Sequence, residues 1–141
     1  MALQEYASPE AIVRNPSIFY KIGITKSKDA EERFTPAYHN LYGFRGRCLG
    51  LDYLVECKWS TFVPKLVADA AEVQWEKKFL KNLWIDEVNG EQYNGITECR
   101  YMDDERYKKA LQYYYGTYKT GKYPYSKDNW KLYLVKFTKR K

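Results

Sequence analysis

Short runs of apolar residues divide the chain into predicted β-strands. Residues 18–25 are rich in β-branched and aromatic side chains, and residues 48–59 alternate between apolar and polar positions in their middle. A weaker alternation over residues 130–137 predicts a late strand. The apolar run at residues 11–13 precedes an Asn-Pro-Ser turn signal, so we expect it to form a hairpin with the strand at residues 18–25.

Longer stretches with apolar residues at helical spacing predict helices. The clearest is residues 65–84, and an apolar face of this kind normally packs on the core. Five apolar residues of this stretch lie close to one helical face: Leu66, Ala70, Val73, Leu80 and Trp84. A second helix is predicted over residues 103–115, and a third is expected to begin near Lys28 with Ser27 as its N-cap.

The order of these elements predicts an α+β fold. We expect a small central antiparallel or mixed sheet with flanking helices. A chain of 141 residues is long enough for one domain with a substantial core. Residues 1–102 are expected to form this domain, and residues 103–141 a basic, tyrosine-rich C-terminal extension that is packed on the domain or continues it.

Charge is unevenly distributed along the chain, whose net charge is +6. Residues 106–141 hold 11 of the 24 Lys and Arg residues and a single acid, Asp128. The chain also has 15 tyrosines, several of them interleaved with these bases. A basic segment with aromatic residues suits a polyanion partner, most often nucleic acid, but it also fits a solvated tail that keeps the protein in solution.

The sequence argues against a structural zinc protein and against a secreted or membrane protein. The three cysteines are widely spaced without a CxxC pair, and with one histidine they form no ordinary structural zinc site. The sequence shows neither a signal peptide nor an apolar run of about 18 residues. We therefore expect a cytoplasmic protein (in the host cytoplasm if it is viral) with reduced cysteines and no membrane partner.

The stretch Tyr20-Lys21-Ile22-Gly23-Ile24-Thr25, followed by Glu31-Glu32-Arg33, resembles the GIY-YIG nuclease superfamily. It is most similar to a branch of phage and fungal proteins whose second motif is K-I-G-x-T followed by E-x-R or E-E-R. Asn94-Gly95-Ile96-Thr97-Glu98 resembles the N-G-x-T-E that often closes the domain of this branch. The resemblance covers about residues 10–102 and implies a GIY-YIG-like fold.

The resemblance implies a metal-dependent endonuclease that hydrolyses phosphodiester bonds, with DNA preferred over RNA. Glu76, or Glu72 one turn earlier, would bind one divalent ion, Mg²⁺ or Mn²⁺. Arg33 would grip a phosphate, and Tyr20 or Lys21 would orient or deprotonate the attacking water. On the residues alone, Arg33 also fits a surface ion pair, and Glu76 a solvated side chain.

Other candidates concern a base and the contacts to nucleic acid. His39 lies six residues after Arg33, where a general base is conceivable, although a surface histidine fits as well. Basic residues of two segments are predicted to contact the phosphate backbone: Arg45 and Arg47 in a glycine-punctuated loop, and Lys119, Lys122 and Lys127 in the C-terminal extension.

Two further hypotheses follow from departures from the family pattern. The tyrosine that ends the family's first motif aligns with Ala11 or Ile12, and Tyr6 replaces it only if the first strand begins earlier. Since Tyr20 and Lys21 are neighbours in a strand, they face opposite sides of the sheet. The chain is therefore alternatively a nucleic-acid-binding protein without catalysis, or a module that uses its tyrosines to bind a protein partner.

Overall fold

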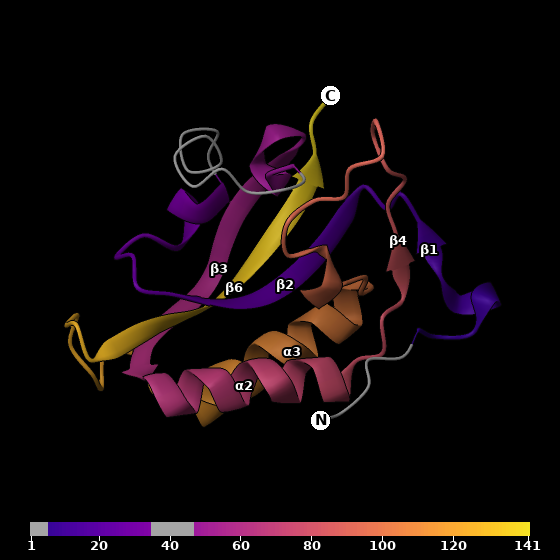
Figure 1. Cartoon of the computed structure of the whole chain (residues 1–141). Coiled ribbons are helices and arrows are strands. Elements are labelled where there is room, and N and C mark those ends of the chain that lie inside the picture. Colours follow the sequence, from indigo (N-terminus) through magenta and orange to yellow (C-terminus); the bar gives the residue numbers. More distant parts are fainter. Residues whose placement is uncertain (1–5, 35–46) are drawn as a thin grey trace.

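The structure, a computed structural model, describes residues 6–34 and 47–141, except for the side chains of residues 32 and 33. The fold is α+β: two helices cover one face of a four-stranded sheet (Figure 1). The sheet strands are β2 (Ile18–Thr25), β3 (Tyr53–Pro64), β5 (Cys99–Arg100) and β6 (Asn129–Lys139). The helices are α2 (Lys65–Lys78) and α3 (Asp104–Thr117).

Shorter elements connect these parts. Two short strands, β1 (Val13–Arg14) and β4 (Leu83–Trp84), pair with each other. Single 3₁₀ turns are η1 (Pro9–Ala11), η2 (Ala30–Phe34), η3 (Leu49–Leu51) and η4 (Ile96–Glu98). The helix expected near Lys28 is therefore the short turn η2. No helix in the described ranges is long and apolar enough to cross a membrane.

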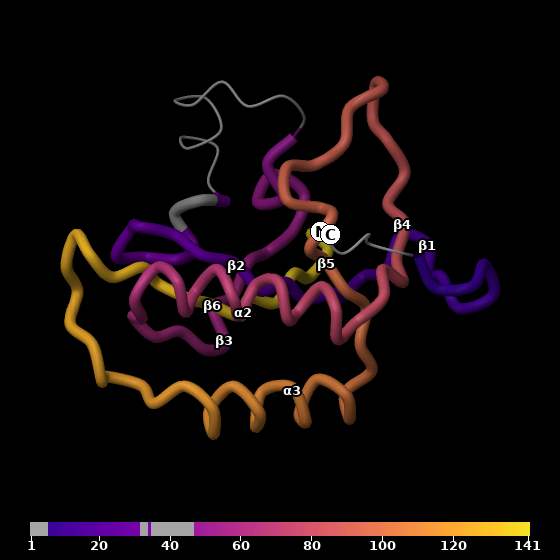
Figure 2. The backbone as a smooth tube through the Cα atoms, turned by 60° about the horizontal axis from the view of Figure 1, so that its bottom comes forward, coloured from indigo at the N-terminus to yellow at the C-terminus, as the bar shows by residue number. Residues whose placement is uncertain are grey.

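The strand β6 lies in the middle of the sheet, whose order is β3-β6-β2-β5. All three pairings are antiparallel, and β6 is paired along its length with β2 on one side and β3 on the other (Figures 1 and 2). Leu132, Leu134, Val135 and Phe137 of β6 are fully buried. Residues 103–141 thus contribute α3 and a central strand to the same sheet that contains β2.

A bulge in β3 changes which of its residues point to each face of the sheet. The register shifts between Cys57 and Trp59, which changes the face to which alternate residues point. Tyr53 therefore packs in the core beneath η2 and η3, whereas Trp59 packs in the core beneath α2 and α3. The strand was expected at residues 48–59; it begins later because residues 49–51 form η3, and it continues to Pro64.

The helix α2 packs on the sheet through a different face from the one expected. Ala68, Ala71 and Trp75 are its buried residues. By contrast, Leu66 is 82% exposed and Val73 is 48% exposed, so the expected apolar face is wrong. Two small alanines allow the helix to approach the sheet closely, and the large Trp75 ring then fills the remaining space.

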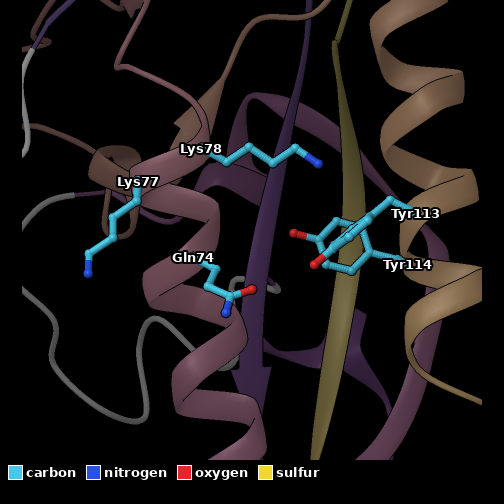
Figure 3. Close-up of a pocket in the computed structure, with 5 residues that line it drawn as sticks. All are labelled: Gln74, Lys77, Lys78, Tyr113 and Tyr114. Carbon is cyan, nitrogen blue, oxygen red and sulfur yellow. The ribbon is translucent and has the colours of Figure 1, made fainter.

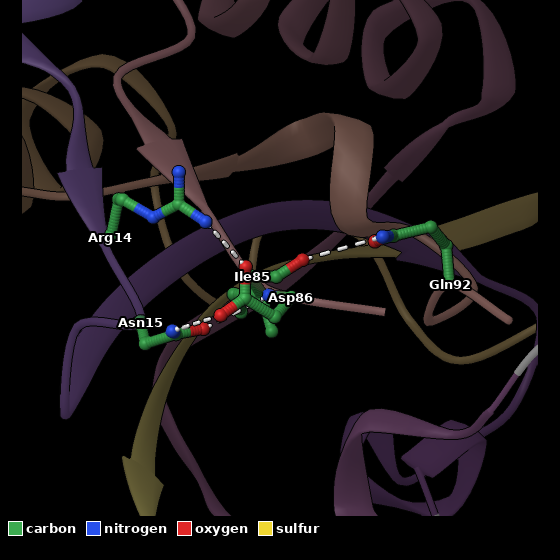
Figure 4. Close-up of polar contacts among 5 residues, drawn as sticks. All are labelled: Arg14, Asn15, Ile85, Asp86 and Gln92. Atoms are coloured by element: carbon green, nitrogen blue, oxygen red, sulfur yellow. Dashed lines mark hydrogen bonds and ion pairs between the residues drawn. The ribbon is translucent and has the colours of Figure 1, made fainter. Parts of the chain in front are cut away.

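The expected hairpin between residues 11–13 and β2 is also wrong, because β1 pairs in parallel with β4 (Figure 4). Asp86 holds this pair together: its carboxylate accepts bonds from Arg14 at 2.7 Å and Asn15 at 2.8 Å. The Asn15 amide oxygen accepts from the Asp86 backbone N–H at 3.0 Å. Asn15 has a φ of 48°, a left-handed conformation that asparagine tolerates and that turns the chain away before β2.

Candidate functional site

Tyr20 and Lys21 lie on opposite faces of the sheet, as expected for strand neighbours. Tyr20 packs in the core under α2 and α3, where its ring stacks on Tyr107 with centroids 4.2 Å apart. Burial, followed by the proximity of Tyr107 and Asp104, raises the pKa of Tyr20 to about 12. The Tyr20 hydroxyl is therefore protonated at neutral pH and separated by the sheet from Lys21.

Lys21 is 6% exposed and projects from β2 toward the segment that contains Gly95. Gly95 has a φ of 78°, a conformation that favours glycine, and a Cβ atom added there would lie 3.0 Å from Lys21 Cε. Burial lowers the pKa of Lys21, but Tyr133, Glu98, Cys99 and Glu72 favour its charged form, and the net shift is upward. Lys21 is therefore a fixed cation rather than a base at neutral pH.

The glycine of the second motif has a packing role. Gly23 faces Tyr133 across the β2–β6 pair, and a Cβ atom at Gly23 would overlap the Tyr133 ring, with Cε2 only 2.8 Å away. Tyr133 is fully buried, and its hydroxyl has no hydrogen-bond partner among the described residues. The glycine in the pattern Ile-Gly-Ile is thus explained by packing, because the Tyr133 ring lies over β2 at this position and leaves no room for a side chain.

Cys99 on β5 is surrounded by three buried cations, Lys21, Lys81 and Arg100. The Lys81 ammonium donates to the Ile96 carbonyl at 3.0 Å, and burial lowers its pKa. Burial raises the pKa of the Cys99 thiol to about 12, so it is protonated and unreactive at neutral pH. The cluster is therefore cationic without a nucleophilic thiol.

Arg100 joins the end of α2 to the chain around η4. Its Nε donates to the Phe79 carbonyl at 2.8 Å, and its Nη1 donates to the Thr97 carbonyl at 2.6 Å and the Cys99 carbonyl at 2.8 Å. Nη2 has no partner within the described part of the chain. A guanidinium at the C-terminal end of a helix satisfies free carbonyl groups and opposes the negative end of the helix dipole.

Glu76 lies half-buried on α2. Burial lowers the pKa of the Arg100 guanidinium, and the nearby Glu76 carboxylate partly opposes this shift. A neighbouring contact fixes the helix to η4: Trp75 Nε1 donates to the Glu98 carbonyl at 2.7 Å. Among the described residues no group of three His, Cys, Asp or Glu side chains is placed to hold a metal ion. If Glu76 binds Mg²⁺, water molecules would therefore supply the other ligands of the ion.

Three candidates fall outside what the structure describes. They are the side chain of Arg33, whose backbone belongs to η2, and residues His39 and Arg45. Their predicted roles stay predictions.

Arg47 is engaged within the protein. Its guanidinium forms an ion pair with Asp52 and lies 5.1 Å from the centre of the Tyr93 ring. The Tyr93 hydroxyl donates to the same carboxylate. Burial, followed by this bond to Asp52, raises the pKa of Tyr93. The three side chains tie residue 47 to the segment before η4, so the positive charge of Arg47 is already neutralised by a carboxylate.

A basic and aromatic surface lies where β2 and β3 end and α2 and β6 begin, at the left of Figure 1. We call it the end face. It carries four lysines and three aromatic residues: Lys26, Lys28, Lys65, Lys131, Phe62, Tyr125 and Trp130.

Lysines and rings alternate on the end face. The Trp130 ring has Lys26 Nζ at 5.0 Å and Lys65 Nζ at 5.5 Å from its centre, and Lys28 Nζ lies 6.0 Å from the Tyr125 ring. Lys65 also pairs with Asp69 at 2.9 Å. Cation–π contacts do not neutralise a lysine charge, whereas the Asp69 carboxylate offsets the charge of Lys65.

The sheet register builds the second half of this surface. Lys131 is opposite Phe62 on β3 and Thr25 on β2, and its Nζ lies 5.2 Å from the Phe62 ring. The Phe62 and Tyr125 rings meet at 5.4 Å with an interplanar angle of 64°. Three separate chain segments, residues 26–28, 62–65 and 125–131, therefore converge here because β6 lies between β2 and β3.

The predicted contacts Lys119, Lys122 and Lys127 are exposed in the connection between α3 and β6. Tyr125 of the end face belongs to the same connection. Lys122 Nζ lies 5.6 Å from the Tyr123 ring, and the Lys119 carbonyl is within 3.5 Å of the Thr61 hydroxyl. The structure thus puts these lysines on a chain segment that borders the end face.

A groove of about 290 Å³ lies between α2 and α3 (Figure 3). Its lining residues are Gln74, Lys77, Lys78, Tyr113 and Tyr114. Lys78 extends across the groove, and its Nζ lies 4.1 Å from the centre of the Tyr113 ring. The groove thus places Lys78 against one tyrosine ring, whereas the end face combines four lysines with three rings.

Sequence reasoning missed most residues of both sites. Lys81 and Arg100 carry no signal, because single bases in a mixed segment are normally solvated. For the end face, the pairing of Trp130 with Lys131 just after the basic connection was a usable signal. Comparison of the chain with protein-family models, curated proteins and solved structures gives no match.

Proposed function

We propose that this protein binds nucleic acid through its end face. The observation that carries the proposal is the alternation of four lysines with three aromatic rings on one surface. Lysines neutralise phosphates and release condensed counterions, whereas rings offer flat apolar surface to bases. The cytoplasmic location and the preference for DNA expected from the sequence stay predictions.

Removing two lysines of the end face is expected to weaken binding about ten-fold at low salt, because each lysine contributes about one phosphate contact. The variant is Lys26→Ser with Lys28→Ser, since both side chains are exposed. The slope of log affinity against log salt concentration should fall by about 2. Fluorescence anisotropy with a labelled oligonucleotide over a salt series measures both quantities.

The matched control is Lys108→Ser with Lys109→Ser on α3, which removes the same charge from lysines that pair with Asp104 and Glu105. It should leave the salt slope within experimental error. Equal weakening in both variants would show that only net charge matters. Binding that does not change with salt would contradict the proposal and favour the protein-partner hypothesis.

A second candidate function is the GIY-YIG-like, metal-dependent endonuclease. The observation that favours it is the proximity of Lys21 in the second motif to Gly95 and Glu98 in the Asn-Gly-Ile-Thr-Glu segment. In this proposal Glu76 holds one divalent ion, which supplies charge stabilisation at the phosphate. Lys21 contributes a fixed positive charge, and Arg33 grips the phosphate.

If the chain is an endonuclease, Glu76→Gln and Arg33→Ala should each lower the cleavage rate at least about 100-fold, as expected for loss of a group that stabilises transition-state charge. Plasmid, linear duplex, single-stranded DNA and RNA are incubated with Mg²⁺ or Mn²⁺ and the products separated on gels. Glu105→Gln on the exposed side of α3 is the control. Cleavage that survives both substitutions, or no cleavage, would refute this candidate.

A further inference from the structure

The end face presents flat ring surface as well as charge, and this combination discriminates between forms of nucleic acid. Tyr125 is 55% exposed, Phe62 is partly exposed in contact with it, and Trp130 is partly exposed on the same end face. In a duplex the bases are stacked on each other, so only phosphates and groove edges reach a flat protein surface. In a single strand the base faces are free to stack on aromatic side chains.

We propose that the end face selects single-stranded nucleic acid, with unpaired bases stacked on Tyr125 and Trp130 and phosphates held by the flanking lysines. This inference rests on the proposed nucleic-acid binding and specifies its substrate class.

The arrangement of the lysines supports this specificity. Lys26 and Lys65 flank one ring, Trp130, and Lys28 lies beside the next, Tyr125. A strand whose bases contact successive rings would therefore have a lysine beside each stacked base. Binding to a duplex backbone depends mainly on charge, whereas exposed rings add base stacking only for unpaired bases.

The protein itself keeps these rings in place. Trp130 is partly packed against the core beneath α2 and α3 and pairs with Val63 across β3. Phe62 supports Tyr125 edge-on, with an angle of 64° between the rings. Rings held in this way lose little freedom when a base stacks on them, which favours binding.

The test compares one labelled mixed-sequence oligonucleotide as a single strand and annealed to its complement, by fluorescence anisotropy on the full chain at fixed salt. The single strand should bind at least about ten-fold more tightly. Tyr125→Ala should weaken single-strand binding about ten-fold and duplex binding less than about two-fold, because only unpaired bases stack on the ring. The control Tyr115→Ala removes an equally exposed ring (56%) from α3 and should change neither affinity.

The possible outcomes separate this inference from the proposed function. Equal affinity for both forms, with no effect of Tyr125→Ala, would overturn single-strand selection but leave salt-sensitive nucleic-acid binding intact. Tighter duplex binding would overturn it in the same way. Failure to bind either form would overturn both proposals.

Discussion

Arg100→Met is expected to lower the free energy of unfolding by about 3 kcal/mol, because three carbonyl groups lose their donor and the shorter methionine cannot replace it. The Arg100 side chain is fully buried, and its bond to the Cys99 carbonyl is buried with it. Part of the loss is offset, since the variant no longer buries a charge. Urea denaturation followed by tryptophan fluorescence measures the change.

The position of Arg100 explains why the effect should be large. It holds the last turn of α2, through Phe79, to the chain around η4. Arg100→Lys should be intermediate, because an ammonium keeps the charge but lacks the fork of donors. The control Arg106→Met, at an exposed site on α3, should stay within about 0.5 kcal/mol of the parent. An Arg100→Met loss below about 1 kcal/mol would show that the carbonyls find other partners.

Gly23→Ala is expected to destabilise the protein by about 3 kcal/mol, because the added methyl group would overlap the buried ring of Tyr133. The control is Gly116→Ala in α3, where no atom lies within 4 Å of the added Cβ atom. There the substitution should stabilise the helix by about 0.5–1 kcal/mol. The two changes are chemically identical, so their opposite signs isolate the packing effect at residue 23.

A double-mutant cycle tests the cause. Tyr133→Leu removes the ring that lies over Gly23, so Gly23→Ala should cost about 1–2 kcal/mol less in that background than in the parent. If instead Gly23→Ala leaves stability unchanged and abolishes nucleic-acid binding, the glycine serves a ligand and the packing explanation is wrong.

Local patterns in the sequence predicted the elements better than their arrangement. The strand at residues 18–25 matches β2, the late strand begins within one residue of β6, and the long helix begins at Lys65 as expected. These signals come from composition and spacing within a few residues. The sheet order could not be predicted, because alternation says which face of a strand is buried but not which strand lies beside it.

Local sequence patterns also failed to predict which face of α2 is buried and which residues meet at the candidate site. Helical periodicity favoured the larger residues Leu66 and Val73, but the close approach of the helix selected two alanines and Trp75 for burial. Opposite orientation of Tyr20 and Lys21 was predicted because it depends only on strand geometry. Only the Trp130–Lys131 part of the end face had a local sequence signal, since the surface as a whole joins three separate segments that meet through tertiary pairing.

The central place of β6 has a consequence for how the chain is made. β2 and β3 leave the ribosome well before residues 129–139, yet neither is paired with the other in the finished sheet. Until β6 has been synthesised and inserts between them, each of these strands has an edge whose backbone N–H and C=O groups are unpaired. Assembly of the sheet therefore depends on the last of its four strands to be synthesised, and the nascent chain passes through a stage in which self-association competes with folding.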